Sequence, residues 1–190
     1  MSGEDSGGAV SLADLPVYED DPAELRRTFS YFPSGVVAMI AEVEGVMHGL
    51  VASAFTVGVS IDPPLVSCAV QRTSSTWPVL RGARRIGVSV LAQHQGDLAR
   101  RIAGRDRAER FTGVPLRHTG SSARFIAGAP VWFECALHDE LPAGDHTLAL
   151  LRVHGLGADP ESRPLVFHGS TFRGLQLDDA ELRGTARHET

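Results

Sequence analysis

The chain has 190 residues, 43% of them hydrophobic and 22% charged, and this composition is sufficient to fill the core of one domain. The formal net charge of −5 argues against a basic nucleic-acid-binding face, and no apolar run approaches the roughly 18 residues of a membrane span, so we expect neither a nucleic-acid nor a membrane partner. All 18 basic residues are arginines, which excludes Schiff-base lysine chemistry and a lysine-bearing P-loop.

The two ends of the chain are predicted to lie outside the core. Residues 1–21 are small, polar and acidic, and we expect a flexible arm there, without a signal-peptide pattern. Residues 176–190 form a polar, charged tail. Residues 22–175 are therefore the predicted domain.

Two helices are predicted from their boundaries. Residues 23–31 follow Pro22, which stands at a helix-start position, and Pro33 ends the run. Residues 97–103 show helical spacing of apolar side chains, and Gly104 is the expected C-terminal cap.

Short β-like runs make up most of the remaining domain. They are apolar or β-branched and are bounded by Gly, Pro, Asp or Ser, and the predicted strands are residues 36–43, 65–70, 86–91, 131–137, 148–153 and 165–167. Many strands, few helices and 20 glycines favour a mainly β fold, a barrel or a sandwich, over an alternating βαβ fold.

The two cysteines, Cys68 and Cys135, lie in apolar runs and form no C-x-x-C pair, so no zinc framework is predicted. Their setting is typical of buried, reduced thiols in a cytoplasmic protein. A single disulfide between them stays open as an alternative.

The segment Gly49–Pro64 reads GLVASAFTVGVSIDPP and gathers small residues around one aromatic side chain, Phe55. Such a stretch lets backbone N–H and C=O groups approach a flat ligand closely. The alternative is a tightly packed strand and turn that ends at Asp62.

A second candidate segment, Gln71–Trp77, reads QRTSSTW and places four hydroxyl residues and an arginine after a predicted strand. Hydroxyls, turn amides and a guanidinium could form a phosphate cradle. The alternative is a polar turn that caps a short helix beginning at Trp77.

Gly144-Asp145-His146 lies between two predicted strands, either as a hairpin turn or as a mount for an imidazole at the mouth of a barrel. The spacing of the other histidines predicts no metal site. The arginines between Arg100 and Arg110 alternate with acidic residues, which is typical of a solvated surface, with phosphate binding as the weaker alternative.

Taken in order, these segments resemble the flavin reductase-like family, the FMN-binding split-barrel domain of two-component monooxygenase systems. The resemblance spans about residues 25–175 and is carried by LRRTF and FPSGV in residues 25–36, VASAFT and SIDPPL in 51–65, SSTW and GVSVL in 74–91, and RF, GAP, EC, GDH and PLVFHG in 110–169. It departs from the family pattern at Ala54 and Ser89, where the family has Ser and Asn, and residues 55–62 are one residue longer.

The resemblance implies a mainly β, Greek-key split barrel with a few short helices that forms a homodimer. It implies an NAD(P)H:flavin oxidoreductase that binds FMN or FAD, takes hydride from NADH or NADPH, and supplies reduced flavin to a separate monooxygenase. Hydride transfer between stacked rings requires no nucleophile, metal or strong base, which agrees with the motifs present.

By position, the resemblance implies that His146 is the catalytic residue beside the nicotinamide and the flavin ring. It implies that Ala52, Ser53, Ala54 and Phe55 line the ring edge. The full implied flavin-binding set is Val51, Ala52, Ser53, Ala54, Phe55, Thr56, Ser60, Ser74, Ser75, Thr76 and Phe172, in which the hydroxyls of Ser60, Ser74, Ser75 and Thr76 would serve ribityl and phosphate groups and Phe172 would cover the pocket.

Two alternative functions remain open at this point. One is a flavoprotein that keeps its flavin and reduces another acceptor. The other is a non-enzymatic flavin-binding module.

Overall fold

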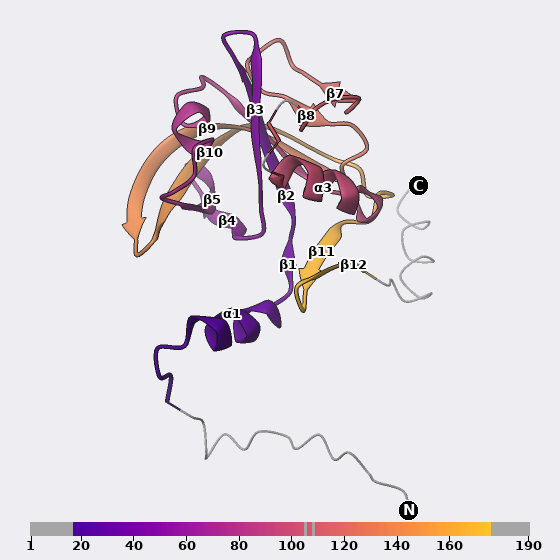
Figure 1. Ribbon diagram of the computed structural model, residues 1–190. Coiled ribbons are helices and arrows are strands. Elements are labelled where there is room, and N and C mark those ends of the chain that lie inside the picture. The colour runs from indigo at the N-terminus through magenta and orange to yellow at the C-terminus, as the bar shows by residue number, and fades with distance from the viewer. Residues whose placement is uncertain (1–16, 105, 108, 176–190) are drawn as a thin grey trace, which may run out of the picture.

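The computed structural model describes residues 17–104, 106–107 and 109–175 (Figure 1). Its elements in chain order are α1 (Pro22–Ser30), β1 (Ser34–Gly35), β2 (Val37–Val43), β3 (Val46–Ala52), β4 (Phe55–Ile61), β5 (Pro64–Gln71), α2 (Trp77–Leu80), β6 (Ile86–Val90), the 3-10 turn η2 (Gln93–Gln95), α3 (Gly96–Ala103), β7 (Leu116–Arg117), β8 (Phe125–Ile126), β9 (Val131–Ala143), β10 (His146–Ala158), β11 (Leu165–His168) and β12 (Thr171–Gly174).

Seven strands form one antiparallel sheet in the order β3-β2-β6-β9-β10-β5-β4. The sheet curls around an apolar interior, but β3 and β4 stand at its two edges and do not pair, so the barrel remains open on one side. This is the mainly β fold with few helices that the sequence predicted. Three short strands, β1, β11 and β12, form a separate small sheet below it (Figure 1).

The barrel interior is one of two hydrophobic clusters, and β2 separates them. Met39 points into the interior, where Leu151 and Val88 are also fully buried. The next residue of β2, Ile40, points to the second cluster, which α3 covers with Ile102. A strand buried on both faces shows a continuous apolar run rather than alternation, which is what VVAMIA shows.

Strands β9 and β10 are longer than the sequence predicted. Each has 13 residues, and together they form a curved hairpin that leaves the barrel body (Figure 1). The part of β9 beyond its predicted run, residues 138–143, is mostly polar, and β10 continues past its predicted run at both ends, through residues 146–147 and through the glycine-containing residues 154–158. The two-residue turn begins with Gly144 at φ +60°, a left-handed conformation that suits glycine, and it leaves His146 as the first residue of β10.

The predicted helices are confirmed with small shifts of their ends. Helix α1 buries none of its residues. Helix α3 stops at Gly104, which is extended at φ −63° and ψ 163° rather than in the left-handed conformation that a glycine cap commonly adopts. Strand β3 was not predicted, and β4 was foreseen only as an alternative to a ligand-binding stretch.

The predicted domain boundaries stay a prediction, because the tail and most of the arm lie outside the described residues. Within the described part of the chain, no helix is both long enough and apolar enough to cross a bilayer.

Candidate active site

A narrow cavity of about 350 Å³ opens where the barrel is split, and we call it the slot. One wall is the end of β3 with the bend after it, and the other is the end of β5. The slot is lined by Leu50, Val51, Ala52, Ser53, Ala54, Ala69, Val70, Gln71, Ser74 and His146.

The walls of the slot are suited to a flat ligand. Ala52, Ala54 and Ala69 bring only methyl groups to it, so a planar ring can approach the backbone closely. The Ala69 N–H donates to the Ala54 carbonyl at 2.9 Å, which holds the bend against β5. Because β3 is an edge strand, alternate backbone N–H and C=O groups face away from the sheet. The carbonyl of Gly49 accepts from Arg110, and the outward groups nearer the slot can pair with a ring edge.

His146 reaches the slot from the tip of the β9–β10 hairpin. It pairs with Gln71 across the β5–β10 ladder, and its Nδ1 lies 2.7 Å from Oδ1 of Asp145. The backbone carbonyl of Asp145 accepts from the N–H of Arg72 at 3.0 Å, so the hairpin tip is tied to the loop after β5. The imidazole is therefore fixed at one end of the slot.

The loop that carries Ser74, Ser75 and Thr76, which we call the hydroxyl loop, both lines the slot and caps α2. Ser74 lines the slot, yet its Oγ accepts from the N–H of Trp77 at 3.2 Å, so the alternative of a turn that caps α2 is also realised. Ser75 accepts a hydrogen bond from Arg107, and Thr76 accepts one from Arg110 at 3.3 Å.

Arg107 and Arg110 thus bring two cations to this loop. Arg110 also donates to the carbonyls of Gly104 (2.7 and 3.1 Å) and Gly49 (3.1 Å), all neutral acceptors. Desolvation first, and then the nearby charge of Arg107, lower the pKa of Arg110. The two guanidiniums and Thr76 line a small recess of about 220 Å³ beside residues 46–49 of β3, which offers an anion one hydroxyl and positive charge together.

A larger cavity of about 780 Å³ adjoins the slot, and Ser53 and Ala54 line both. We call it the aromatic cavity, because Phe29, Phe32, Phe55 and Phe167 contribute to its wall beside Arg26, Ser30, Ser34, Thr56 and Ser170. Its lining comes partly from α1. The two cavities together have room for two ligands that meet at the bend after β3.

The structure brings most of the candidate residues together. Val51, Ala52, Ser53, Ala54, Ser74 and His146 line the slot, Phe55 and Thr56 line the aromatic cavity, and Ser75 and Thr76 contact the two arginines.

Two candidates lie elsewhere. Ser60 pairs with Leu65 further along β4 and lines neither cavity. Phe172 packs on Phe167 at 5.6 Å between ring centroids, with the guanidinium of Arg100 4.9 Å from its centroid, and so covers α3 rather than the slot.

The sequence analysis did not single out Arg26, and it included Gln71 only as the first residue of the hydroxyl-rich segment. For Arg107 and Arg110 it favoured a solvated surface, with phosphate binding as the weaker alternative. The alternation with acidic residues favoured a solvated surface, whereas the structure turns these two arginines toward Ser75 and Thr76. No pattern within the sequence pairs residues 107–110 with 75–76. Across the described residues, no group of three or more His, Cys, Asp or Glu side chains could hold a metal ion.

The family described as "Flavin reductase like domain" matches residues 29–176. An "NADH-dependent flavin reductase" of a Rhodococcus species is 37% identical over 169 residues, covering 84% of this chain and 89% of the relative. The reductase subunit HsaB of a flavin-dependent monooxygenase of Rhodococcus jostii is 28% identical over 94% of this chain and 88% of its own length.

Among solved structures, the NADH:FAD oxidoreductase SgcE6 of Streptomyces globisporus, in complex with NAD and FAD fragments, superposes with a TM-score of 0.80. It is 33% identical to this chain and matches 86% of this chain and 98% of its own. The ordered sequence blocks, the split barrel and these comparisons agree, and the chain belongs to the flavin reductase-like family.

Proposed function

We propose that the protein is an NAD(P)H-dependent flavin reductase that transfers a hydride from NADH or NADPH to FMN or FAD and releases the reduced flavin to a separate monooxygenase. The observation that carries this proposal is the pair of adjoining cavities that share Ser53 and Ala54, with His146 at one end of the slot. Hydride transfer requires the donor ring and the acceptor ring to stack in contact. Two cavities that meet at one bend would allow the two rings to do so.

The residues present fit a flavin in the slot. The methyl-lined walls and the unpaired edge of β3 would hold the ring, and Ser53, Gln71 and Ser74 would serve its polar groups. Ser75, Thr76, Arg107 and Arg110 would hold the phosphate, since charge-assisted hydrogen bonds suit that group. When bound, the flavin supplies the hydride acceptor, and the chain binds, orients and shields it.

The nicotinamide would enter from the aromatic cavity. His146 would orient its carboxamide from the slot side, and Arg26, on the wall of the aromatic cavity, would face the negative charge of a dinucleotide. Closing both rings off from water would prevent loss of the hydride equivalent before the flavin leaves.

A second copy of this chain would complete the aromatic cavity. Phe29, Tyr31 and Phe32 are 65%, 63% and 75% exposed at the end of α1, and this helix buries nothing in its own chain. Strand β4 is an edge with Val57 and Ile61 exposed. An apolar helix end beside an open sheet edge supports a homodimer in which each partner covers the other.

The partner that consumes the reduced flavin would be a flavin-dependent monooxygenase, as the similarity to a monooxygenase reductase subunit supports. A cytoplasmic location is proposed as well, because Cys68 and Cys135 are both buried free thiols. The alternative of a disulfide between these two cysteines is wrong, because both thiols are free in the structure.

The testing experiment follows absorbance at 340 nm with the protein, NADH or NADPH, and catalytic or excess FMN or FAD in air. Loss of absorbance that scales with protein and saturates in added flavin is expected. Tight copurifying flavin without turnover of free flavin would instead indicate a flavoprotein with another acceptor, and flavin binding without oxidation of the nicotinamide would indicate a binding module.

A further inference from the structure

A cavity of about 370 Å³ lies on the outer surface of β9 and β10, and none of its lining residues lines the slot or the aromatic cavity. We call it the outer pocket. The residues that matter to its chemistry are Arg117, Phe125, Trp132, Glu134, Gly155 and Gly157.

The partly buried indole of Trp132 forms part of the outer pocket. The Nε1–H of Trp132 donates to the carbonyl of Ile126 at 2.9 Å, which fixes the orientation of the ring. Gly157 is the cross-strand partner of Trp132, and a Cβ there would lie 3.7 Å from Cε3 of the indole. Glycine at this position leaves that side of the ring open to a flat ligand.

A fixed carboxylate stands beside the indole. Oε1 of Glu134 accepts from the hydroxyls of Ser121 at 2.5 Å and Thr119 at 2.8 Å. The Ser121 bond above all lowers the pKa of Glu134 against the opposing effect of burial, so the group stays ionised. Among the described residues, no group donates to Oε2, which lies 3.6 Å from where a Cβ of Gly155 would stand.

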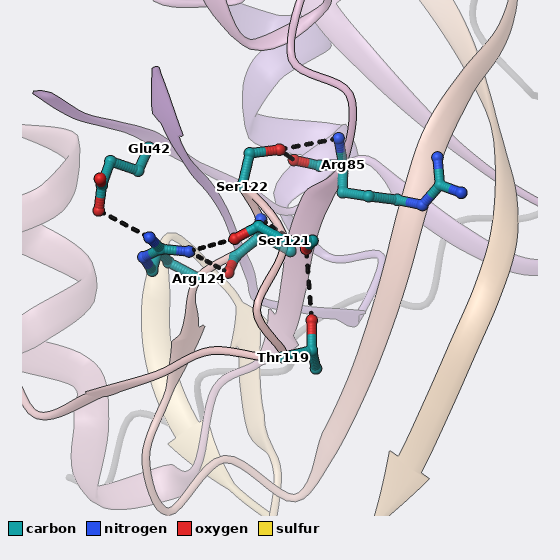
Figure 2. A network of polar contacts seen from close by, with 7 residues as sticks. Glu42, Arg85, Thr119, Ser121, Ser122 and Arg124 are labelled. Atoms are coloured by element: carbon teal, nitrogen blue, oxygen red, sulfur yellow. Dashed lines mark hydrogen bonds and ion pairs between the residues drawn. The ribbon is translucent and has the colours of Figure 1, made fainter. Parts of the chain in front are cut away.

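The loop that supplies these hydroxyls is itself tied down (Figure 2). Arg124 bonds Glu42 of β2 at 2.7 Å and the carbonyl of Ser121 at 2.6 Å. Ser122 exchanges two hydrogen bonds with the backbone of Arg85, at 2.7 and 2.9 Å. The carboxylate is therefore preorganised, and such a group recognises donors at little entropic cost.

Two arginines, Arg117 and Arg85, flank the carboxylate. Arg117 and His118 line the outer pocket. On the other side, Arg85 lies 3.4 Å from Nδ1 of His154, and the charge of Arg85 helps to lower the pKa of Glu134. Desolvation and the nearby arginines lower the pKa of His154 itself. An entering ligand thus meets an aromatic surface, one carboxylate oxygen that needs a donor, and a positive rim.

We propose that the outer pocket binds a purine mononucleotide. The base stacks on Trp132, a base N–H donates to Oε2 of Glu134, and the phosphate lies against Arg117. Stacking on an indole, pairing with a carboxylate and contact with a guanidinium are established ways of holding a base, its N–H edge and its phosphate. A neutral aromatic ligand without an N–H donor leaves both the carboxylate and the arginine without partners.

The test titrates the whole protein with AMP and with GMP and follows the two indole N–H resonances by NMR, because the chain contains only two tryptophans. The signal of Trp132 should shift saturably, whereas the signal of Trp77, which is bonded to Glu140, should not. Replacing Trp77 by Phe assigns the two signals.

Variants locate the binding. Gly157→Val fills the space beside the indole and Glu134→Gln removes the charge, and each should weaken AMP binding about tenfold or more. Arg117→Gln should weaken AMP binding but not adenosine binding, and Arg163→Gln, outside the outer pocket, should change neither. Gly157→Val should keep full flavin reductase activity, which confirms that it folds.

Three results would overturn the proposal. One is no shift of Trp132 at millimolar AMP or GMP. Another is AMP binding that survives Gly157→Val and is displaced by excess flavin, since the nucleotide would then occupy the reductase site. The third is benzoate giving the same shift as AMP, since benzoate carries no N–H donor for Glu134.

Discussion

Oδ1 of Asp145 lies 2.7 Å from Nδ1 of His146, its neighbour in the chain. The Asp145 side chain is 92% exposed and that of His146 only 32%, so the carboxylate stands in water and the ring turns inward. The hydrogen bond to His146 lowers the pKa of Asp145, with a smaller contribution from the charge of Arg26. An ionised carboxylate can only accept, so Nδ1 carries the proton and Nε2 is the nitrogen left for a ligand in the slot.

His146→Ala should slow flavin reduction about tenfold to a hundredfold while changing flavin affinity little. In the proposed arrangement the imidazole, at the hairpin tip beside Gln71, would orient the nicotinamide more than it would hold the flavin. Stopped-flow absorbance separates the hydride step from flavin binding, which fluorescence titration measures.

Asp145→Asn should give a smaller loss of the same kind, because it leaves the ring but weakens its fixed orientation. Asp159→Asn, on an exposed turn, is the matched control and should behave as the wild type. Equal losses of rate and flavin affinity in His146→Ala would contradict the assigned role.

Arg107→Gln and Thr76→Ala should each raise the dissociation constant of FMN, by about tenfold for the arginine and less for the hydroxyl, and leave that of riboflavin nearly unchanged. Hydrogen bonds to charged groups contribute roughly 1.5–3 kcal/mol, and a tenfold change corresponds to about 1.4 kcal/mol. Isothermal titration with the two flavins measures the difference.

Arg173→Gln, which removes an arginine outside the loop, is the control for a general loss of positive charge. Riboflavin affinity that falls as much as FMN affinity would show that the hydroxyl loop holds the ring or the ribityl chain instead of the phosphate.

Much of the barrel could be predicted because most of its long strands contain an apolar run that turn residues bound on both sides. The run 65–70 lies between turn residues and is almost wholly apolar, and it became β5. Strand β3 was not predicted because His48 and Gly49 interrupt the apolar residues of VMHGLVA and leave only short apolar runs on either side. A local hydrophobic pattern indicates which residues are buried. Strand β3 is defined instead by its backbone pairing with β2.

The site was predictable only where one segment holds it. Residues 51–56 were found because small residues around Phe55 form a local signature. The contact of Arg107 with Ser75 was not found, since it joins positions 32 apart through the fold. Phe172 fits the same explanation: the resemblance implied that it covers the flavin pocket, but Gly96 on α3 leaves the space in which it packs, and no local pattern pairs these two positions.

Phe32→Arg should shift the protein from dimer to monomer and reduce reductase activity. Phe32 is 75% exposed and lines the aromatic cavity, so a charge there would be buried without a partner in the homodimer. Light scattering reports the mass. Leu175→Arg, at another exposed apolar position, is the control and should stay dimeric. A monomeric wild-type protein with full activity would contradict the homodimer.

The free energy of unfolding should fall as the pH rises from about 9 to 12. Burial raises the pKa of the Cys68 and Cys135 thiols to about 12, and the charge of Glu134 adds to the effect at Cys135. In the unfolded chain these thiols ionise near pH 9, so stability is complete below that pH and is lost above it, by at most about 1.4 kcal/mol per pH unit for each thiol.

The chain suits this measurement because it contains no lysine and only two tyrosines, so few other groups titrate in this range. Urea unfolding at a series of pH values should show a steep alkaline limb in the wild type. Cys68→Ala and Cys135→Ala should each flatten it, although each also lowers stability at neutral pH by creating a small cavity. A limb that keeps its slope in the double variant would assign the alkaline loss to the tyrosines, and native thiols that react with Ellman's reagent at pH 8 would show that they are not buried as described.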